Sequence, residues 1–363
     1  MKAAGYKTLV KDGMYNAFPS IVRAKNGSLV MVFRQADNSL EKYGVVSHVD
    51  PSSRVVMMTS DDDGNSWSEV KTIYNDEMGE QDPCLTCLQD GTLVCTFFRW
   101  KVVPKEDSEV LGEAYKHYGR IIFDRWAAVH VGTLCIRSRD NGETWEGPFP
   151  LVPDGYQGPA ALRGNLVEQA DGRLLAPLYA VKKFGELSSC VIMGTEDQGE
   201  TWQSIGEVPG LPDLHFVEPF LYQAPSGRLD MLLRTHRDFL KMPFDETYMH
   251  LHISSSRDGG KSWSTPVPTE LFCPNPVHVL PVQDEKVLVT YGQRRDPKGI
   301  EGFLTSAEHP EFRDADTNSI KPAESGDLGY TSAVELHDGT VLIVYYMTDS
   351  DAGTCIGATW LEV

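Results

Sequence analysis

Short apolar runs separated by tight turns recur along the whole chain. Around Asn26-Gly27, for example, residues 20–24 lead into the turn, and residues 28–33, apolar from Leu29 on, leave it. Two strand-like runs joined by such a turn predict a β-hairpin. The sequence contains six of these hairpins, with turns at Asn26-Gly27, Asp90-Gly91, Asp171-Gly172, Ser226-Gly227, Asp284-Glu285 and Asp338-Gly339.

A second pattern, S/T-x-D-x-G-x-S/T-W, follows each of the first four hairpins. Its four copies are residues 60–67, 138–145, 195–202 and 256–263. In such a turn the Asp accepts backbone N–H bonds, the Gly allows a positive φ, and the Trp packs beneath. The pattern therefore predicts a repeated, stapled turn, which explains architecture and does not by itself identify a chemistry.

Six hairpins at a spacing of tens of residues, each with room for two more strands, predict an all-β fold: a six-bladed β-propeller with four-stranded antiparallel blades and Asp-box turns. We expect one domain over residues 1–363. Residues 5–10 could supply the strand that the last blade lacks, which would remove a free edge. The longest interval between hairpins holds an insertion at about 100–130, with helical patterning only at 107–118.

The composition limits the partners. A formal net charge of −19 and a sequence pI near 4.9 argue against nucleic acid and anionic membrane. No apolar run is long enough to cross a membrane, and the N-terminal residues lack a signal-peptide core.

Seven cysteines, odd in number and mostly in strand-like runs, fit reduced thiols in the cytoplasm; a leader already removed would instead mean secretion. No metal and no cofactor are predicted, because Cys84-x-x-Cys87 and His250-x-His252 lack further ligands. The sequence does not predict an oligomeric state.

Candidate chemistry gathers at one rim of the predicted propeller. In each blade, the start of the first strand and the end of the second strand share that rim. Counting nine residues back and seven forward from the second residue of each hairpin turn selects eight polar rim residues: Arg34, Asp82, Arg163, Tyr179, Glu218, Arg234, Tyr330 and Tyr346. Carboxylates, guanidinium groups and phenols around one concavity suit the recognition of a carboxylated sugar.

With these features the chain resembles the sialidase (neuraminidase) superfamily, whose repeat-bearing relatives are called BNR-repeat proteins. The resemblance lies in the Asp boxes, in residues 217–234, which run from Glu218 to Arg234, and in residues 329–339, which open the last blade with Tyr330. It implies a carbohydrate substrate, Tyr330 as nucleophile, Glu218 as its base and Arg234 as part of a carboxylate clamp. A tyrosine suits an anomeric carbon that bears a carboxylate, because an anionic Asp or Glu would be repelled.

The resemblance also implies a general acid on the loop after the first hairpin and a clamp arginine in the fifth blade. For the acid we select Asp50, with His48 as a substrate contact beside it and Asp37 as the alternative. For the fifth blade, Arg294 and Arg295 are the neighbouring arginines, and Arg295 is taken as the substrate contact.

One departure from the family pattern is Ala17, which stands where an arginine is expected two residues before the first-blade proline. The resemblance nevertheless predicts a retaining, sialidase-like glycoside hydrolase. Because of Ala17, we expect its substrate to be an acidic or highly hydroxylated sugar, not sialic acid specifically. Two other functions stay open: a non-catalytic carbohydrate-binding propeller, and a glycosidase or lyase that uses Asp82 and Glu218 as a carboxylate pair.

Overall fold

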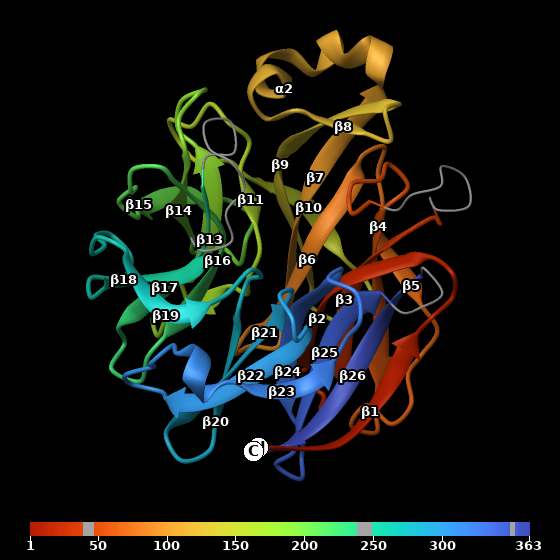
Figure 1. Cartoon of the computed structure of the whole chain (residues 1–363), viewed down its shortest axis with the longest axis vertical. Coiled ribbons are helices and arrows are strands. Elements are labelled where there is room, and N and C mark those ends of the chain that lie inside the picture. Colours follow the sequence, from red (N-terminus) through yellow and green to blue (C-terminus); the bar gives the residue numbers. More distant parts are fainter. Residues whose placement is uncertain (39–46, 238–248, 349–352) are drawn as a thin grey trace.

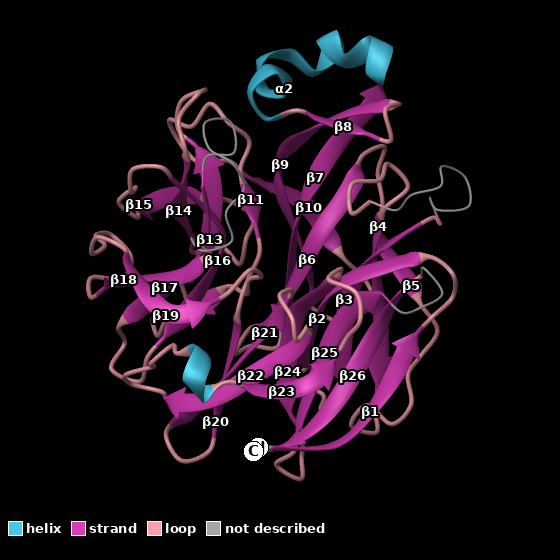
Figure 2. Cartoon of the chain, in the orientation of Figure 1, coloured by secondary structure: helices cyan, strands magenta, loops and turns pink. Residues whose placement is uncertain are grey.

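Nearly all regular structure in the computed structural model is β-strand (Figure 1 and Figure 2). The structure describes residues 1–38, 47–237, 249–348 and 353–363. Within those ranges the helices are short: η1 (Lys105–Leu111), α2 (Gly112–Tyr118) and η3 (Asp314–Asp316). None of the helices in this part of the chain is long and apolar enough to cross a membrane.

The strands form five hydrogen-bonded sheets in a propeller-like arrangement. The largest sheet has eight strands: β1 (Lys2–Val10), β2 (Tyr15–Arg23), β3 (Leu29–Ala36), β4 (Arg54–Ser60), β5 (Lys71–Tyr74), β24 (Leu328–Glu335), β25 (Val341–Thr348) and β26 (Thr354–Glu362). The second has five: β6 (Gly79–Cys87), β7 (Leu93–Pro104), β8 (Arg120–Ile122), β9 (Trp126–Ser138) and β10 (Glu146–Leu151). The third also has five: β11 (Ala161–Leu162), β12 (Val167–Glu168), β13 (Leu174–Val181), β14 (Ser188–Thr195) and β15 (Gln203–Glu207).

The last two sheets have four strands each. One consists of β16 (Leu214–Gln223), β17 (Leu229–Arg237), β18 (His250–Ser256) and β19 (Val267–Phe272). The other consists of β20 (His278–Val282), β21 (Lys286–Gln293), β22 (Gly299–Ser306) and β23 (Asn318–Pro322).

The all-β, propeller-like prediction is confirmed, whereas the prediction of six separate four-stranded blades is wrong. A parallel pair between Tyr15 and Thr354 joins β2 to β26 and merges two antiparallel runs into the eight-stranded sheet. In the second sheet, β8 of the insertion adds a fifth strand on β9. In the third, β11 and β12 pair separately with β13. Sequence periodicity does not report such pairings, because each depends on only a few residues.

The chain ends meet in the eight-stranded sheet. Strand β1 pairs with β26 from Lys2 opposite Glu362 to Val10 opposite Ile356, so the N-terminal residues cover that edge as expected. Figure 1 shows both termini together, and it shows α2 and β8 at the far end of the molecule from them. The insertion is thus an extension of the β7–β9 hairpin beyond the sheets.

The four S/T-x-D-x-G-x-S/T-W turns share one hydrogen-bond pattern. In the first, the Asp62 carboxylate accepts bonds from the Ser66 N–H (2.8 Å) and hydroxyl (2.6 Å). Ser60 Oγ accepts from the Gly64 N–H at 2.9 Å, and Gly64 has φ of 85°. The other carboxylates bind Thr144, Thr201 and Ser262 in the same way. Each turn is therefore closed by hydrogen bonds among its own residues, and the Asp carboxylate is used to hold the turn.

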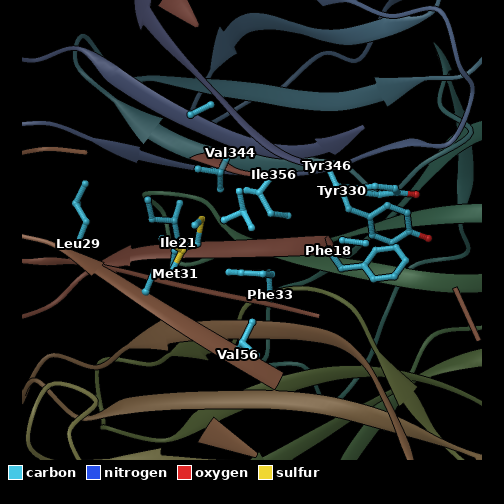
Figure 3. Packing of buried hydrophobic residues seen from close by; sticks show 14 of the residues in the cluster. Phe18, Ile21, Leu29, Met31, Phe33, Val56, Tyr330, Val344, Tyr346 and Ile356 are labelled. Atoms are coloured by element: carbon cyan, nitrogen blue, oxygen red, sulfur yellow. The ribbon is translucent and has the colours of Figure 1, made fainter. Parts of the chain in front are cut away.

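One buried hydrophobic cluster extends to the candidate residue Tyr330. Figure 3 shows Ile21, Met31 and Phe33 to the left of the Phe18 and Tyr330 rings, and all five residues belong to one buried cluster. The Phe18 and Tyr330 rings meet edge to face at 4.5 Å between centroids. Such a contact contributes about 0.5–1.5 kcal/mol beyond burial and fixes the orientation of the Tyr330 ring.

Candidate active site

Four residues at the starts of inner strands have an unusual backbone. Phe18, Asp82, Glu218 and Tyr330 have φ of 56°, 50°, 46° and 52°. At each, the strand register shifts, so the residue sits in a bulge. A left-handed non-glycine residue costs about 1–3 kcal/mol, and such residues cluster at functional sites because the surrounding structure must hold them in place. At each bulge the in–out alternation of side chains along the strand is interrupted, so the bulged side chain can point in a different direction.

The structure brings Tyr330, Glu218 and Arg234 into direct contact. The Tyr330 hydroxyl donates to Glu218 Oε1 at 2.6 Å. Arg234 Nη1 donates to Glu218 Oε2 and, at 3.2 Å, to the Tyr330 hydroxyl oxygen. All three side chains are largely buried. A phenol, a carboxylate that can take its proton and a guanidinium that can stabilise the resulting phenolate therefore meet at one point.

The electrostatics of this group follow from burial. Burial, and next the Glu218 carboxylate, raise the pKa of Tyr330 well above its usual range, while Arg234 opposes that shift. The phenol is consequently neutral at physiological pH, and its proton can leave only to a base in contact with it. Glu218 Oε1 occupies that position.

Asp82 and Arg34 form a second buried polar group beside the first. Burial and the Glu218 carboxylate raise the pKa of Asp82 to about 8, and Asp82 Oδ1 has no hydrogen-bond partner among the described residues. Arg34 is fully buried over the Tyr15 ring, at 5.1 Å, and its three guanidinium nitrogens also lack partners within the described ranges. Buried polar groups are normally hydrogen-bonded, so these atoms are suited to a polar ligand or to water.

The arginines around Tyr330 differ in what they bind. Arg163 lies over its ring at 5.1 Å, but its Nη2 donates to the main-chain carbonyls of Pro19 and Tyr330, at 3.3 and 3.2 Å. Its Nη1 lies 3.5 Å from the Pro83 carbonyl oxygen. These carbonyls belong to three different inner strands, so Arg163 ties the bulged strands together at the centre.

In the fifth-blade position the structure brings Arg294, not Arg295, next to the nucleophile candidate. Arg294 lies over the Tyr330 ring at 6.0 Å and donates to the Tyr346 hydroxyl at 3.2 Å. Arg295 stacks on Phe272 at 3.7 Å and lies 3.6 Å from Asp314. Both arginines line a cleft of about 160 Å³ beside Arg234, whose other lining residues are His236, Met249, Phe272 and Pro274.

The remaining predicted residues lie further along the same side. Tyr179 is half-buried, and burial followed by the Glu218 and Asp82 carboxylates raises its pKa, which places it near both acids. Asp50 is buried and accepts bonds from the Ser52 N–H and hydroxyl through Oδ1, at 2.9 and 2.6 Å. His48 is exposed, and its Nε2 lies 3.4 Å from Arg120 Nη1.

Sequence reasoning missed two features here. Phe18 was assigned no role, yet it orients Tyr330 and Tyr346 by edge contacts; its equivalence to Asp82 and Glu218 was the available signal. Arg120 comes from the insertion, where no repeat position predicts it. No group of three His, Cys, Asp or Glu side chains among the described residues could hold a metal ion.

Comparison with known proteins agrees with this architecture. The family model of the BNR repeat-like domain matches residues 120–343, more than half of the chain. No curated protein matches significantly. A protein of unknown function from Dyadobacter fermentans is similar at 29% identity and a TM-score of 0.87, covering 100% of this chain and 99% of that one.

Two solved enzymes share the fold at lower identity. The NanB sialidase of Streptococcus pneumoniae has 13% identity and a TM-score of 0.69, over 99% of this chain and 70% of that one. The alpha-L-arabinanase of Penicillium chrysogenum, complexed with arabinobiose, has 13% identity and a TM-score of 0.65, over 99% and 98%. The chain therefore belongs to the BNR repeat-like domain family and has the sialidase-like fold of that superfamily.

Proposed function

We propose that the protein is a retaining glycoside hydrolase in which Tyr330 is the nucleophile and Glu218 its base. The observation that carries the proposal is the 2.6 Å hydrogen bond from the Tyr330 hydroxyl to Glu218 Oε1, with Arg234 bound to both residues. Nucleophile, base and an orienting third group in mutual contact are the arrangement that activates a weak nucleophile.

The first step would form a bond between the Tyr330 oxygen and the anomeric carbon as the phenol proton passes to Glu218. The glycosidic bond breaks, and the departing oxygen takes a proton from the general acid, for which Asp50 stays our candidate. Water then attacks the same carbon and gives a proton to the deprotonated acid, while the bond between that carbon and the Tyr330 oxygen breaks and Tyr330 regains its proton from Glu218. Arg234 would stabilise the phenolate in both steps because it already donates to that oxygen.

The charges suit an acidic or highly hydroxylated sugar. Arg234 and Arg294 both line the cleft next to Tyr330. Ala17 is fully buried and offers no third guanidinium at the place where the sialidase pattern has one. We therefore propose two arginine contacts to the sugar from this side, supplemented by the unpartnered Arg34 and Asp82.

The test is hydrolysis of a panel of aryl glycosides by Tyr330→Phe and Glu218→Gln. Each variant should lose at least about 10²-fold in kcat, because each removes a partner in proton transfer. Tyr345→Phe is a matched control: its hydroxyl, also buried, bonds Thr359 at 2.9 Å, outside the site. Wild-type turnover by both site variants, on a substrate that the protein cleaves, would contradict the proposal.

One observation favours a second function. Asp82 has a pKa raised to about 8 by burial and by the Glu218 carboxylate, so it is protonated at neutral pH and could act as an acid opposite Glu218. In that case Asp82→Asn, and not Tyr330→Phe, should abolish turnover. The same panel of glycosides separates the two mechanisms.

A further inference from the structure

Within the described part of the chain, the insertion places an arginine without an ion pair close to His48 and Tyr179. Arg120 opens β8 and lies over the Trp100 ring at 5.2 Å. Its Nη1 is 3.4 Å from His48 Nε2, on the loop that carries Asp50. No carboxylate pairs with Arg120 among the described residues.

That lack of a partner is notable in an acidic chain. Most described arginines form ion pairs, as Arg23 does with Asp63 and Arg137 with Glu146. The described arginines without an ion pair include four around Tyr330 or His48: Arg34, Arg120, Arg163 and Arg294. In a protein of net charge −19, four arginines with no carboxylate partner among the described residues therefore lie around the candidate site.

Packing holds Arg120 in place. Trp100 is 3% exposed and meets the His130 ring at 3.8 Å. Trp100 belongs to a buried cluster with Val49 and Ala161, against which Tyr179 packs. The cluster joins the insertion, the loop of His48 and the strand of Tyr179, so the Trp100 ring on which the exposed Arg120 lies is held in place relative to the candidate site.

The position of His48 in its loop indicates which sugar unit Arg120 would face. His48 is two residues from Asp50, the candidate general acid. A general acid must contact the glycosidic oxygen, so groups beyond it face the sugar unit that departs. Arg234 and Arg294 line the cleft beside the nucleophile, for the unit that is attacked, and Arg120 is not among the residues that line it.

We propose that Arg120 binds an oxyanion, a carboxylate or a sulfate, on the sugar unit released by cleavage. The inference rests on the proposed hydrolase function and adds a leaving-group subsite formed by the insertion. His130 would stay uncharged beside it, because burial and the neighbouring Arg120 lower the pKa of His130 to about 3. The positive charge of the subsite is therefore that of the Arg120 guanidinium.

The experiment measures binding and not turnover, in the Tyr330→Phe background. The probes are pairs of disaccharides that differ only by a carboxylate, or only by a sulfate, on the reducing-end unit, titrated by calorimetry. At least one acidic member should bind about tenfold more tightly than its neutral parent, and Arg120→Gln should abolish that preference. The carboxylate and sulfate arms identify which oxyanion is preferred.

Lys116→Gln is the matched control, since it removes one positive charge from α2 of the same insertion and should keep the preference. Equal binding within every pair, no binding by any acidic probe, or a preference that survives Arg120→Gln would each overturn the proposal. Because Tyr330 is already replaced, these results do not depend on catalysis. The activity of Tyr330→Phe on aryl glycosides tests the hydrolase function separately.

Discussion

Aspartates in two regions of this molecule have opposite environments. The Asp-box residues Asp140 and Asp258 are exposed, and each accepts a backbone N–H and a hydroxyl within its own turn. The hydroxyl bonds from Thr144 and Ser262 are the main cause that lowers their pKa to about 2. Asp82 is buried with an unpartnered oxygen, and burial raises its pKa to about 8.

The difference separates what holds the fold from what can do chemistry. An exposed carboxylate that accepts several hydrogen bonds within its turn stays ionised and stabilises that turn. A buried, incompletely satisfied carboxylate destabilises the protein and can exchange a proton near neutral pH. The repeated motif therefore predicted the architecture, whereas function must be sought at positions where the repeats differ.

The largest effect on activity is expected from Arg294, which contacts the candidate site, whereas its neighbour Arg295 does not contact Tyr330. Arg294→Gln should lower kcat/KM on a cleaved glycoside by about 10–100-fold, because Arg294 lies over Tyr330 and donates to Tyr346. Arg295→Gln, which removes a residue stacked on Phe272, should stay within about threefold of wild type. Steady-state kinetics of both variants decide the matter; a larger loss for Arg295→Gln would reverse our assignment.

The repeat predicted the positions of three inner-strand residues because the bulge of each strand lies at the same distance from the hairpin turn. Counting nine residues back from a turn reached Asp82, Glu218 and Tyr330, and the structure gives all three the same bulged, left-handed backbone. The choice between Arg294 and Arg295 could not be made, since β21 ends at Gln293 and both residues lie beyond its alternation. Arg120 lies in an insertion with no counterpart in the repeats, so only the packing on Trp100 reveals its place.

The largest effect on stability is expected at Asp82. Its pKa in the folded protein, about 8, is above the usual value, so the folded state holds an extra proton between about pH 4 and pH 8. The contribution of Asp82 to the free energy of unfolding therefore falls as the pH rises through that window. Each pH unit in that window contributes about 1.4 kcal/mol, so Asp82→Asn should stabilise the protein by about 3 kcal/mol more at pH 8.5 than at pH 5.5.

Urea unfolding of wild type and Asp82→Asn at both pH values measures this difference. Asp107→Asn, an exposed aspartate of η1, serves as the control and should show the same small change at both pH values. A wild-type minus Asp82→Asn difference that does not vary with pH would show that Asp82 is ionised in the folded protein.

The smallest effect is expected in an Asp box, where the sign of the pH dependence reverses. Asp197 accepts bonds from the Thr201 N–H and hydroxyl at 2.9 and 2.6 Å, and its pKa is lowered to about 2 although burial opposes that shift. Its stabilising contribution is thus complete above its usual pKa and is lost as the pH falls toward 2. Asp197→Asn should lower Tm by about 1–3 °C at pH 7 and by less at pH 3, with kcat/KM unchanged. Thermal unfolding at the two pH values tests this, and a change in kcat/KM would mean that the turns and the site are not as separate as their hydrogen bonds indicate.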